Sequence, residues 1–117
     1  MAAELAPEDV RILNDTALLL VYHLHRDWDR AAELLTRAVE LGQKQLENAE
    51  LTKSQRTELE SAWGDAHENL GVLHLEHEHD PAAARRWFQR AVEIGPDPRP
   101  RVVEHWLPQC DAAEEKN

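Results

Sequence analysis

The densest group of chemically capable side chains is the stretch HLEHEHD, from His74 to Asp80. It combines three histidines with three acids, and imidazole and carboxylate groups are common ligands of zinc and nickel and common general acids and bases. His74 and Glu78 would share one face of a helix at i,i+4. The HExxH pattern of zinc enzymes is missing, because His67 is followed by ENLGV. We therefore predict no metal site and no cofactor, and keep a histidine-based metal-binding protein only as an alternative.

A structural role explains the same histidines. His74 and His67 fall on an apolar helical stripe, where we expect packed, hydrogen-bonded imidazoles. His77 and His79 fall in the last turn of a helix, where a histidine interacts well with the negative helix end. HLEHEHD is then chiefly the end of a helix. A mild response near pH 6 stays open, because the seven histidines of the chain titrate there.

The rest of the chain shows no catalytic constellation. A Gly-rich phosphate loop is missing. Cys110 has no activating neighbour, because His105 lies five residues upstream and off its helix face, so we expect a core cysteine. The many acids fall on helix surfaces, where a solvated face is their usual meaning. We therefore expect that the protein is not an enzyme.

Composition narrows the partners and the compartment. The 117 residues suggest one domain, and 13 basic against 23 acidic residues give a net charge of −10. Nucleic-acid binding needs a basic footprint, and anionic membranes repel such a chain, so we predict neither. The single cysteine fits a reducing compartment. The N-terminal residues show no secretory signal, and the longest apolar run, 17–21, is too short for a membrane span, so we expect a cytoplasmic protein.

Apolar residues recur at helical spacing along the whole chain, which predicts an all-α fold of about five helices. Thr52 or Ser54 can cap the third helix. Asp80 followed by Pro81 is a start signal for the fourth. Gly42 resembles a helix stop, but the helix-forming residues after it predict that the second helix runs to about Glu50. Glycine and proline give further helix boundaries. We place Pro7 in the first turn of the first helix and Gly95 and Pro96 at the end of the fourth, and Pro108 should kink or end the fifth.

The second helical hairpin carries a known repeat pattern. It resembles the tetratricopeptide repeat, a helical hairpin of about 34 residues with the signature W-x2-L-G-x2-Y, A-x3-F and P. The matching positions are Leu70, Gly71, Ala84, Phe88, Ala91 and Pro96, with His67 and His74 in place of the two aromatic residues and His79 as a one-residue insertion in the turn. The first hairpin matches at Leu18, Tyr22, Ala31 and Ala38, with Leu19 where the glycine belongs.

The resemblance implies a tetratricopeptide-like array. Repeat one covers about 11–43 and repeat two about 63–97, followed by a capping helix at about 100–110 and a frayed tail at 111–117. The equivalent residues Ala31 and Ala84 lie 53 apart, about nineteen more than one repeat. We assign the excess to an extended helical hairpin, 43–62, which forms a stalk. The apolar residues on the stalk pack against each other or form an interface: Leu46, Leu51, Leu59 and Trp63.

The resemblance also implies a protein interaction module or scaffold, which holds an extended peptide or a helix on the inner face of the first helix of each hairpin. Carried over by register, this groove consists of Leu13, Thr16, Leu20, His23, Leu24, Asp65, Glu68, Val72, Leu75 and Glu76. It is apolar with an acidic stripe, so we expect a partner with apolar anchors and some Lys or Arg. Thr16, Leu20 and Glu68 stand where relatives that clamp a carboxyl terminus carry lysine and asparagine, so we predict no chaperone-tail binding.

Two alternatives stay open for this face. A second copy of the chain could fill it, or the chain could fill it itself. The first helix has no covering neighbour on one side, and two repeats are fewer than stacking usually requires. A self-associating, homodimeric structural module, with the stalk or the first helix as its interface, is therefore the alternative to a peptide-binding module.

Overall fold

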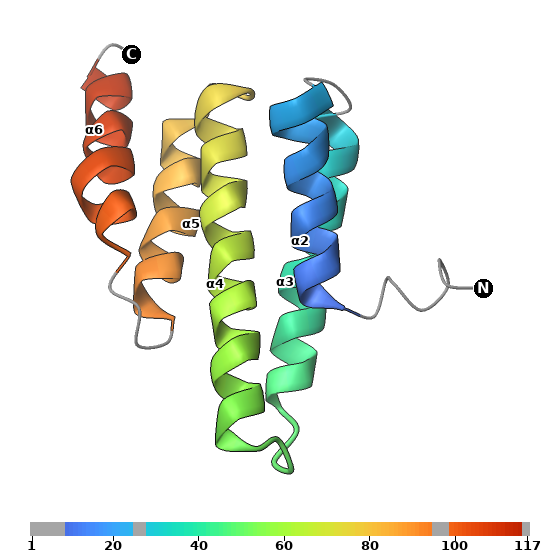
Figure 1. The fold of residues 1–117 in the computed structure, drawn as a ribbon. Coiled ribbons are helices and arrows are strands. Elements are labelled where there is room, and N and C mark those ends of the chain that lie inside the picture. Colours follow the sequence, from blue (N-terminus) through green and yellow to red (C-terminus); the bar gives the residue numbers. More distant parts are fainter. Residues whose placement is uncertain (1–8, 25–27, 95–98, 116–117) are drawn as a thin grey trace.

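The computed structural model describes residues 9–24, 28–94 and 99–115, without the side chains of 22–24, and every regular element in these ranges is a helix (Figure 1). The prediction of an all-α fold is confirmed. The elements in chain order are α2 (Val10–Leu18), the π-helical turn η2 (Leu19–Leu24), α3 (Trp28–Leu46), α4 (Lys53–Glu76), α5 (Pro81–Glu93), the π-helical turn η3 (Val102–Trp106) and α6 (Leu107–Glu115).

The helices form two layers (Figure 1). α2 and α4 make the front layer in this view and run in the same direction, while α3 lies behind α2 and α5 behind α4. The shortest dimension of the molecule, 19 Å, matches two helices of about 10 Å diameter. One core joins α2, α3 and α4, and a second joins α4 and α5 to η3 and α6. α4 therefore contributes to both cores and is the central helix of the fold.

Helix starts follow the predicted chemistry. Thr52 caps α4 with a complete capping box, because its hydroxyl accepts from the N–H of Gln55 and the Gln55 side chain accepts from the N–H of Thr52. Asp80 caps α5, with Pro81 at its first position. Both predictions are confirmed. The predicted roles of Pro7, Gly95 and Pro96 lie outside the described residues.

Two predicted helix ends are wrong. α3 ends at Leu46 and not near Glu50, because the guanidinium of Arg56 donates to the carbonyls of Leu46 and Asn48 at 3.1 Å and so satisfies the end of the helix. α6 continues through Pro108 to Glu115. Pro108 lies inside a continuous helical run, two residues after the end of η3, whose π-helical turn ends with the bond from the Leu107 N–H to the Val102 carbonyl.

The tail predicted to fray is helical as far as the structure describes it. Residues 111–115 belong to α6. Arg85 on α5 forms ion pairs with Asp111 and Glu114 and thereby ties the last turns of α6 to α5. Cys110 is fully buried in the second core, as predicted.

Only part of the predicted helical stalk 43–62 is helical, because residues 47–52 form the connection between α3 and α4. At the base of the stalk, α3 and α4 approach closely at Gly42. The indole of Trp63 lies against this glycine and donates its N–H to the carbonyl of Val39 at 2.8 Å. A Cβ atom on residue 42 would lie 2.9 Å from Cγ of Trp63, which is too close. Gly42 is therefore a contact point inside α3 and does not stop the helix. Leu59 also packs against the first core, so Trp63 and Leu59 act within the fold.

A constant spacing of 53 residues relates the two hairpins, and it corrects the predicted register of the first. α3 begins at Trp28 and α5 at Pro81, and Ala31 and Ala84 are both fully buried. In the first helices, the residue 53 positions before the buried Leu70 is the fully buried Ala17, whereas Leu18 is only partly buried. The predicted pairing of Leu18 with Leu70 is off by one residue, and the turn at His79 needs no insertion.

The contact at Gly42 predicts a stability effect. We expect Gly42→Ala to lower the free energy of unfolding by about 1 kcal/mol, because overpacking against the hydrogen-bonded Trp63 ring costs about 1–3 kcal/mol and outweighs the better helix propensity of alanine. Urea denaturation measures this effect. Gln43→Ala at the exposed neighbouring position should change stability by less than about 0.5 kcal/mol. Equal stability of the two variants would contradict the close packing of α3 on α4.

Candidate binding groove between α2 and α4

A hollow of about 210 Å³ lies between α2 and α4, the first helices of the two hairpins. α2 contributes charged, polar and apolar side chains to its lining, whereas α4 contributes only charged and polar ones. The lining residues are Arg11, Asn14, Asp15 and Leu18 from α2, and Asp65, Glu68 and Asn69 from α4. Two of the ten predicted groove residues, Asp65 and Glu68, are among them.

The structure places most of the other predicted residues elsewhere. Leu13 is buried in the first core, and Val72 and Leu75 are buried in the second under η3 and α6. Leu13 and Val72 do not line the hollow, so that part of the prediction is wrong, whereas Leu75 lines a second hollow between α4 and α6. The first core also takes up Leu20, which packs against it while partly exposed.

The remaining predicted residues divide between exposed positions and side chains that the structure does not describe. Thr16 is exposed, but it lies two residues from Leu18, so the two side chains point in roughly opposite directions. Thr16 therefore faces away from the hollow. Glu76 is exposed at the mouth of the second hollow between α4 and α6. The side chains of His23 and Leu24 lie outside the described residues.

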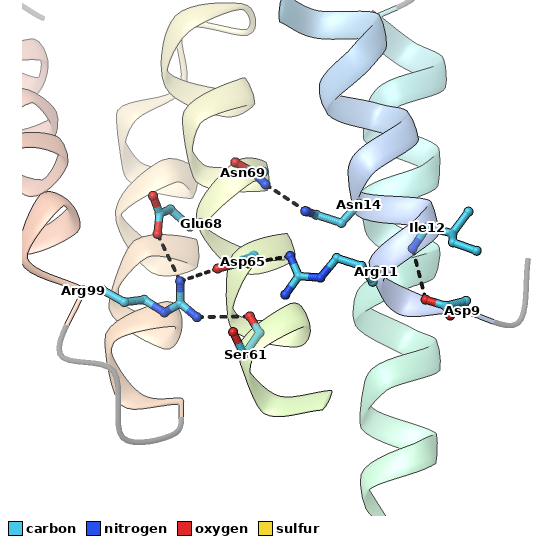
Figure 2. Close-up of polar contacts among 9 residues, drawn as sticks. All are labelled: Asp9, Arg11, Ile12, Asn14, Ser61, Asp65, Glu68, Asn69 and Arg99. Carbon is cyan, nitrogen blue, oxygen red and sulfur yellow. Dashed lines mark hydrogen bonds and ion pairs between the residues drawn. The ribbon is translucent and has the colours of Figure 1, made fainter. Parts of the chain in front are cut away.

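The acidic stripe of α4 is occupied by the chain's own arginines (Figure 2). Arg11 donates to Asp65 Oδ2 at 2.8 Å, and Arg99 donates to Asp65 Oδ1 at 2.8 Å from the other side. Arg99 also reaches Glu68 Oε1 at 3.2 Å and the carbonyl of Ser61 at 3.3 Å. The basic groups that we expected from a partner at these two carboxylates are thus supplied from within. For Asp65 and Glu68, the chain itself fills the face.

Arg99 is a buried structural cation. Its side chain is only 4% exposed, and its guanidinium lies on Gly64, where an added Cβ would come within 2.8 Å of Cζ. Burial by itself lowers the pKa of Arg99. The hydrogen bonds and charges of Asp65 and Glu68 together raise this pKa by more than burial lowers it, so the guanidinium stays protonated. The backbone adopts a positive φ of 48° at Arg99, which is uncommon outside glycine. The pairing must outweigh this local strain.

A buried amide bridge joins α2 to α4 at the same hollow. Asn69 donates its side-chain N–H to Oδ1 of Asn14 at 2.8 Å, and Asn14 is almost fully buried (Figure 2). A buried amide requires a partner, so this bond helps to fix how α2 lies on α4. In the sequence, the only signal is a polar residue on the apolar stripe of the first helix.

Three exposed residues next to the predicted groove positions of the first hairpin were not predicted. Asp15 is exposed, and Ile12 and Leu19 are 44% and 50% exposed. At the spacing of 53, these three residues correspond to Asp65, Glu68 and Val72, which were predicted as groove positions. A register one residue off pointed to the neighbouring positions instead.

The histidines pack with aromatic rings. His67 is fully buried between Trp63 and Trp87, with ring centroids 4.8 and 5.5 Å away, and its Nδ1–H donates to the carbonyl of Trp63 at 2.7 Å. His77 stacks on Trp28 at 4.7 Å. The packed, hydrogen-bonded role predicted for His67 is confirmed. His74 stacks on Trp87, but its buried Nδ1 has no hydrogen-bond partner in the described part of the chain, so the hydrogen bond predicted for it is wrong. Among the residues that the structure describes, no three His, Cys, Asp or Glu side chains come together as a metal site.

Comparison with known proteins gives no relative. No family model matches the chain, and the searches of curated proteins and of solved structures returned no match. None of the described helices is both long and apolar enough to cross a membrane.

The pairing of Arg99 predicts a large loss of stability on truncation. We expect Arg99→Ala to lower the free energy of unfolding by about 2–3 kcal/mol, because it leaves Asp65 and Glu68 without their buried partner. Arg99→Lys should lose less, since it keeps the charge but not the planar fork. Arg101→Ala, an exposed position two residues on, is the control and should cost less than about 0.5 kcal/mol. Similar losses for Arg99→Ala and Arg101→Ala in urea denaturation would contradict the role of this cluster.

The burial of His67 predicts a pH dependence. Desolvation is the main cause that lowers the pKa of His67 below 6.5, and the charges of Arg90 and Arg99 add to it against the bond to Trp63. The unfolded chain therefore binds this proton more readily, so the contribution of His67 to stability is present above about pH 6.5 and declines as the pH falls below it. His67→Gln should show a smaller drop between pH 8 and pH 5 than the parent chain, whereas His105→Gln at an exposed position should keep the parent profile. The same drop in both variants would rule out His67 as its source.

Proposed function

We propose that this chain is a protein interaction module of the tetratricopeptide-like kind, which binds a peptide or helix of a partner along the face of α2 and α4. The observation that carries the proposal is the hollow between these two helices, together with the apolar residues Ile12 and Leu19, which stay exposed outside it. Parallel first helices in one layer (Figure 1) and equivalent buried alanines at Ala31 and Ala84 support the likeness to such repeats.

The second hollow lies between α4 and the C-terminal helical segments η3 and α6. It measures about 660 Å³ and lies between the end of α4 and α6, with Glu76 and His79 on one side and His105, Trp106 and Gln109 on the other. Together the two hollows lie at both seams of the central helix. An extended ligand that crosses α4 would meet polar groups and the indole of Trp106 along its path. This arrangement suits a chain segment better than a compact small molecule.

The chemistry around the groove also favours binding over catalysis. Asp65, Glu68 and Arg99 neutralise one another, and His67 is buried away from the hollow. Burial raises the pKa of the Cys110 thiol, which keeps it protonated and unreactive. The net charge of −10 makes a protein partner a better proposal than a nucleic acid or an anionic membrane.

A homodimeric structural module is the second candidate. One observation favours it: Ile12 and Leu19 are exposed on the helical run of α2 and η2, at one end of the array. A second copy of the chain could cover them. Light scattering over a wide concentration range separates the candidates, because a monomer at every concentration excludes the dimer.

Panning a random-peptide phage library against the chain tests the proposal. We expect selected peptides to lose at least about tenfold in affinity for Asp15→Lys and Glu76→Lys, because both exposed carboxylates border the proposed face. Gln89→Lys changes charge at an exposed position of α5 in the rear layer and should leave binding unchanged. Fluorescence anisotropy measures the affinities. A library that yields no binder, or binders equally sensitive to Gln89→Lys, would contradict the proposal.

A further inference from the structure

Two large apolar side chains stand exposed on the helical run of α2 and η2: Ile12 lies on α2, and Leu19 is the first residue of η2. Ile12 is 44% exposed and Leu19 is 50% exposed. They lie seven residues apart, which places them on nearly the same side of the helix and about 10.5 Å apart along its axis at 1.5 Å per residue. Val103, on η3, is the other large apolar residue with comparable exposure among those described. The pair is therefore a short apolar stripe outside the lining of the hollow, and Figure 2 shows Ile12 on the side of α2 that faces away from α4.

The spacing of this stripe suits a helical partner. In a partner α-helix, two residues seven apart also share one side and have the same separation along the axis. Two apolar side chains of the partner can therefore each pack on one residue of the pair. In an extended strand, the same distance corresponds to about three residues, and strand residues three apart point to opposite faces. An extended strand would place only one of its two side chains on the stripe.

Charge selects the partner further. Asp15 is exposed and lies between Ile12 and Leu19 on the same helical run. Arg11, the cation four residues before it, forms its ion pair with Asp65 across the hollow instead, at 2.8 Å. The exposed Asp15 side chain borders the hollow and lies between the two apolar residues along the helix, in a chain of net charge −10. A lysine or arginine of a partner at this point would gain a favourable interaction.

We infer that the helical run of α2 and η2 docks a basic amphipathic helix of a partner, with two apolar residues seven apart that pack on Ile12 and Leu19 and a lysine or arginine between them that reaches Asp15. This inference rests on the proposed function and specifies its partner. The positions on the partner follow from the spacing of Ile12 and Leu19. One turn of the partner helix packs on each apolar residue, and the turn between them carries the lysine or arginine.

The test uses a designed probe. The probe is a fluorescein-labelled helical peptide on an alanine-glutamine host, with leucines seven residues apart and two lysines between them. One control peptide has the leucines five residues apart, on different sides of the helix, and another has glutamates in place of the lysines. We expect the probe to bind with anisotropy that saturates, and both controls to bind at least about tenfold more weakly.

Variants of the chain locate the contact. Ile12→Ser and Leu19→Ser should each weaken probe binding about tenfold, because each removes a half-exposed apolar side chain from the interface. Asp15→Asn should weaken it about threefold and reduce its salt dependence. Val103→Ser is the matched control, with similar exposure on another element, and should bind like the parent chain. Circular dichroism verifies that the variants stay helical.

Three outcomes overturn the inference, and they also separate it from the proposed function. If phage-selected peptides bind through Asp15 and Glu76 but the helical probe does not bind, the helical partner is wrong and the binding face stands. If neither binds, both fail. If the chain forms a dimer that Leu19→Ser abolishes, a second copy covers the stripe and the docking of a basic helix is wrong.

Discussion

The pairing of Arg99 with Asp65 and Glu68 is the contact on which the arrangement of the helices depends. Arg99 precedes η3, and its guanidinium reaches α4 across Gly64, so it anchors the C-terminal unit to the central helix. Asp65 in turn receives Arg11 from α2 (Figure 2). One carboxylate therefore joins three segments that are distant in the sequence. A buried cation with such partners is costly to leave unpaired, which makes the geometry of this cluster specific.

The cluster also determines what the groove can offer a ligand. The carboxylates that resemble a binding stripe in the sequence are neutralised by internal arginines, and the apolar residues near them, Val72 and Leu75, are covered by η3 and α6. The groups that stay exposed lie on the first helical run, where none of the described helices packs on the outer edge. The proposed binding role therefore falls to α2, which contributes to one core, and less to α4, which contributes to both.

Close approach of the helices relies on residues without bulk. Trp63 lies on Gly42 and Arg99 lies on Gly64, so in each case a planar group occupies the space that a side chain would fill. The planar groups then make polar contacts that hold them in place: the indole N–H of Trp63 with Val39, and the guanidinium of Arg99 with Ser61. The Trp63 pair holds the antiparallel helices α3 and α4 together, and the Arg99 pair holds the segment before η3 on α4.

The sequence by itself determined the all-α class, the capped starts of α4 and α5 at Thr52 and Asp80, and the buried roles of Ala31, Ala84 and His67, because helical periodicity and capping are local properties of the chain. It did not determine the register of the first hairpin, where Leu18 matched the repeat pattern but Ala17 takes the buried position. Residue types alone do not show which of two adjacent apolar residues faces the neighbouring helix. Only the tertiary structure decided that Arg99 crosses to Asp65 and that α6 covers Val72, because ion pairs and burial between distant segments depend on how the helices pack. The exposed pair Ile12 and Leu19 became visible for the same reason: which apolar residues stay uncovered is known only after all the others have found their partners.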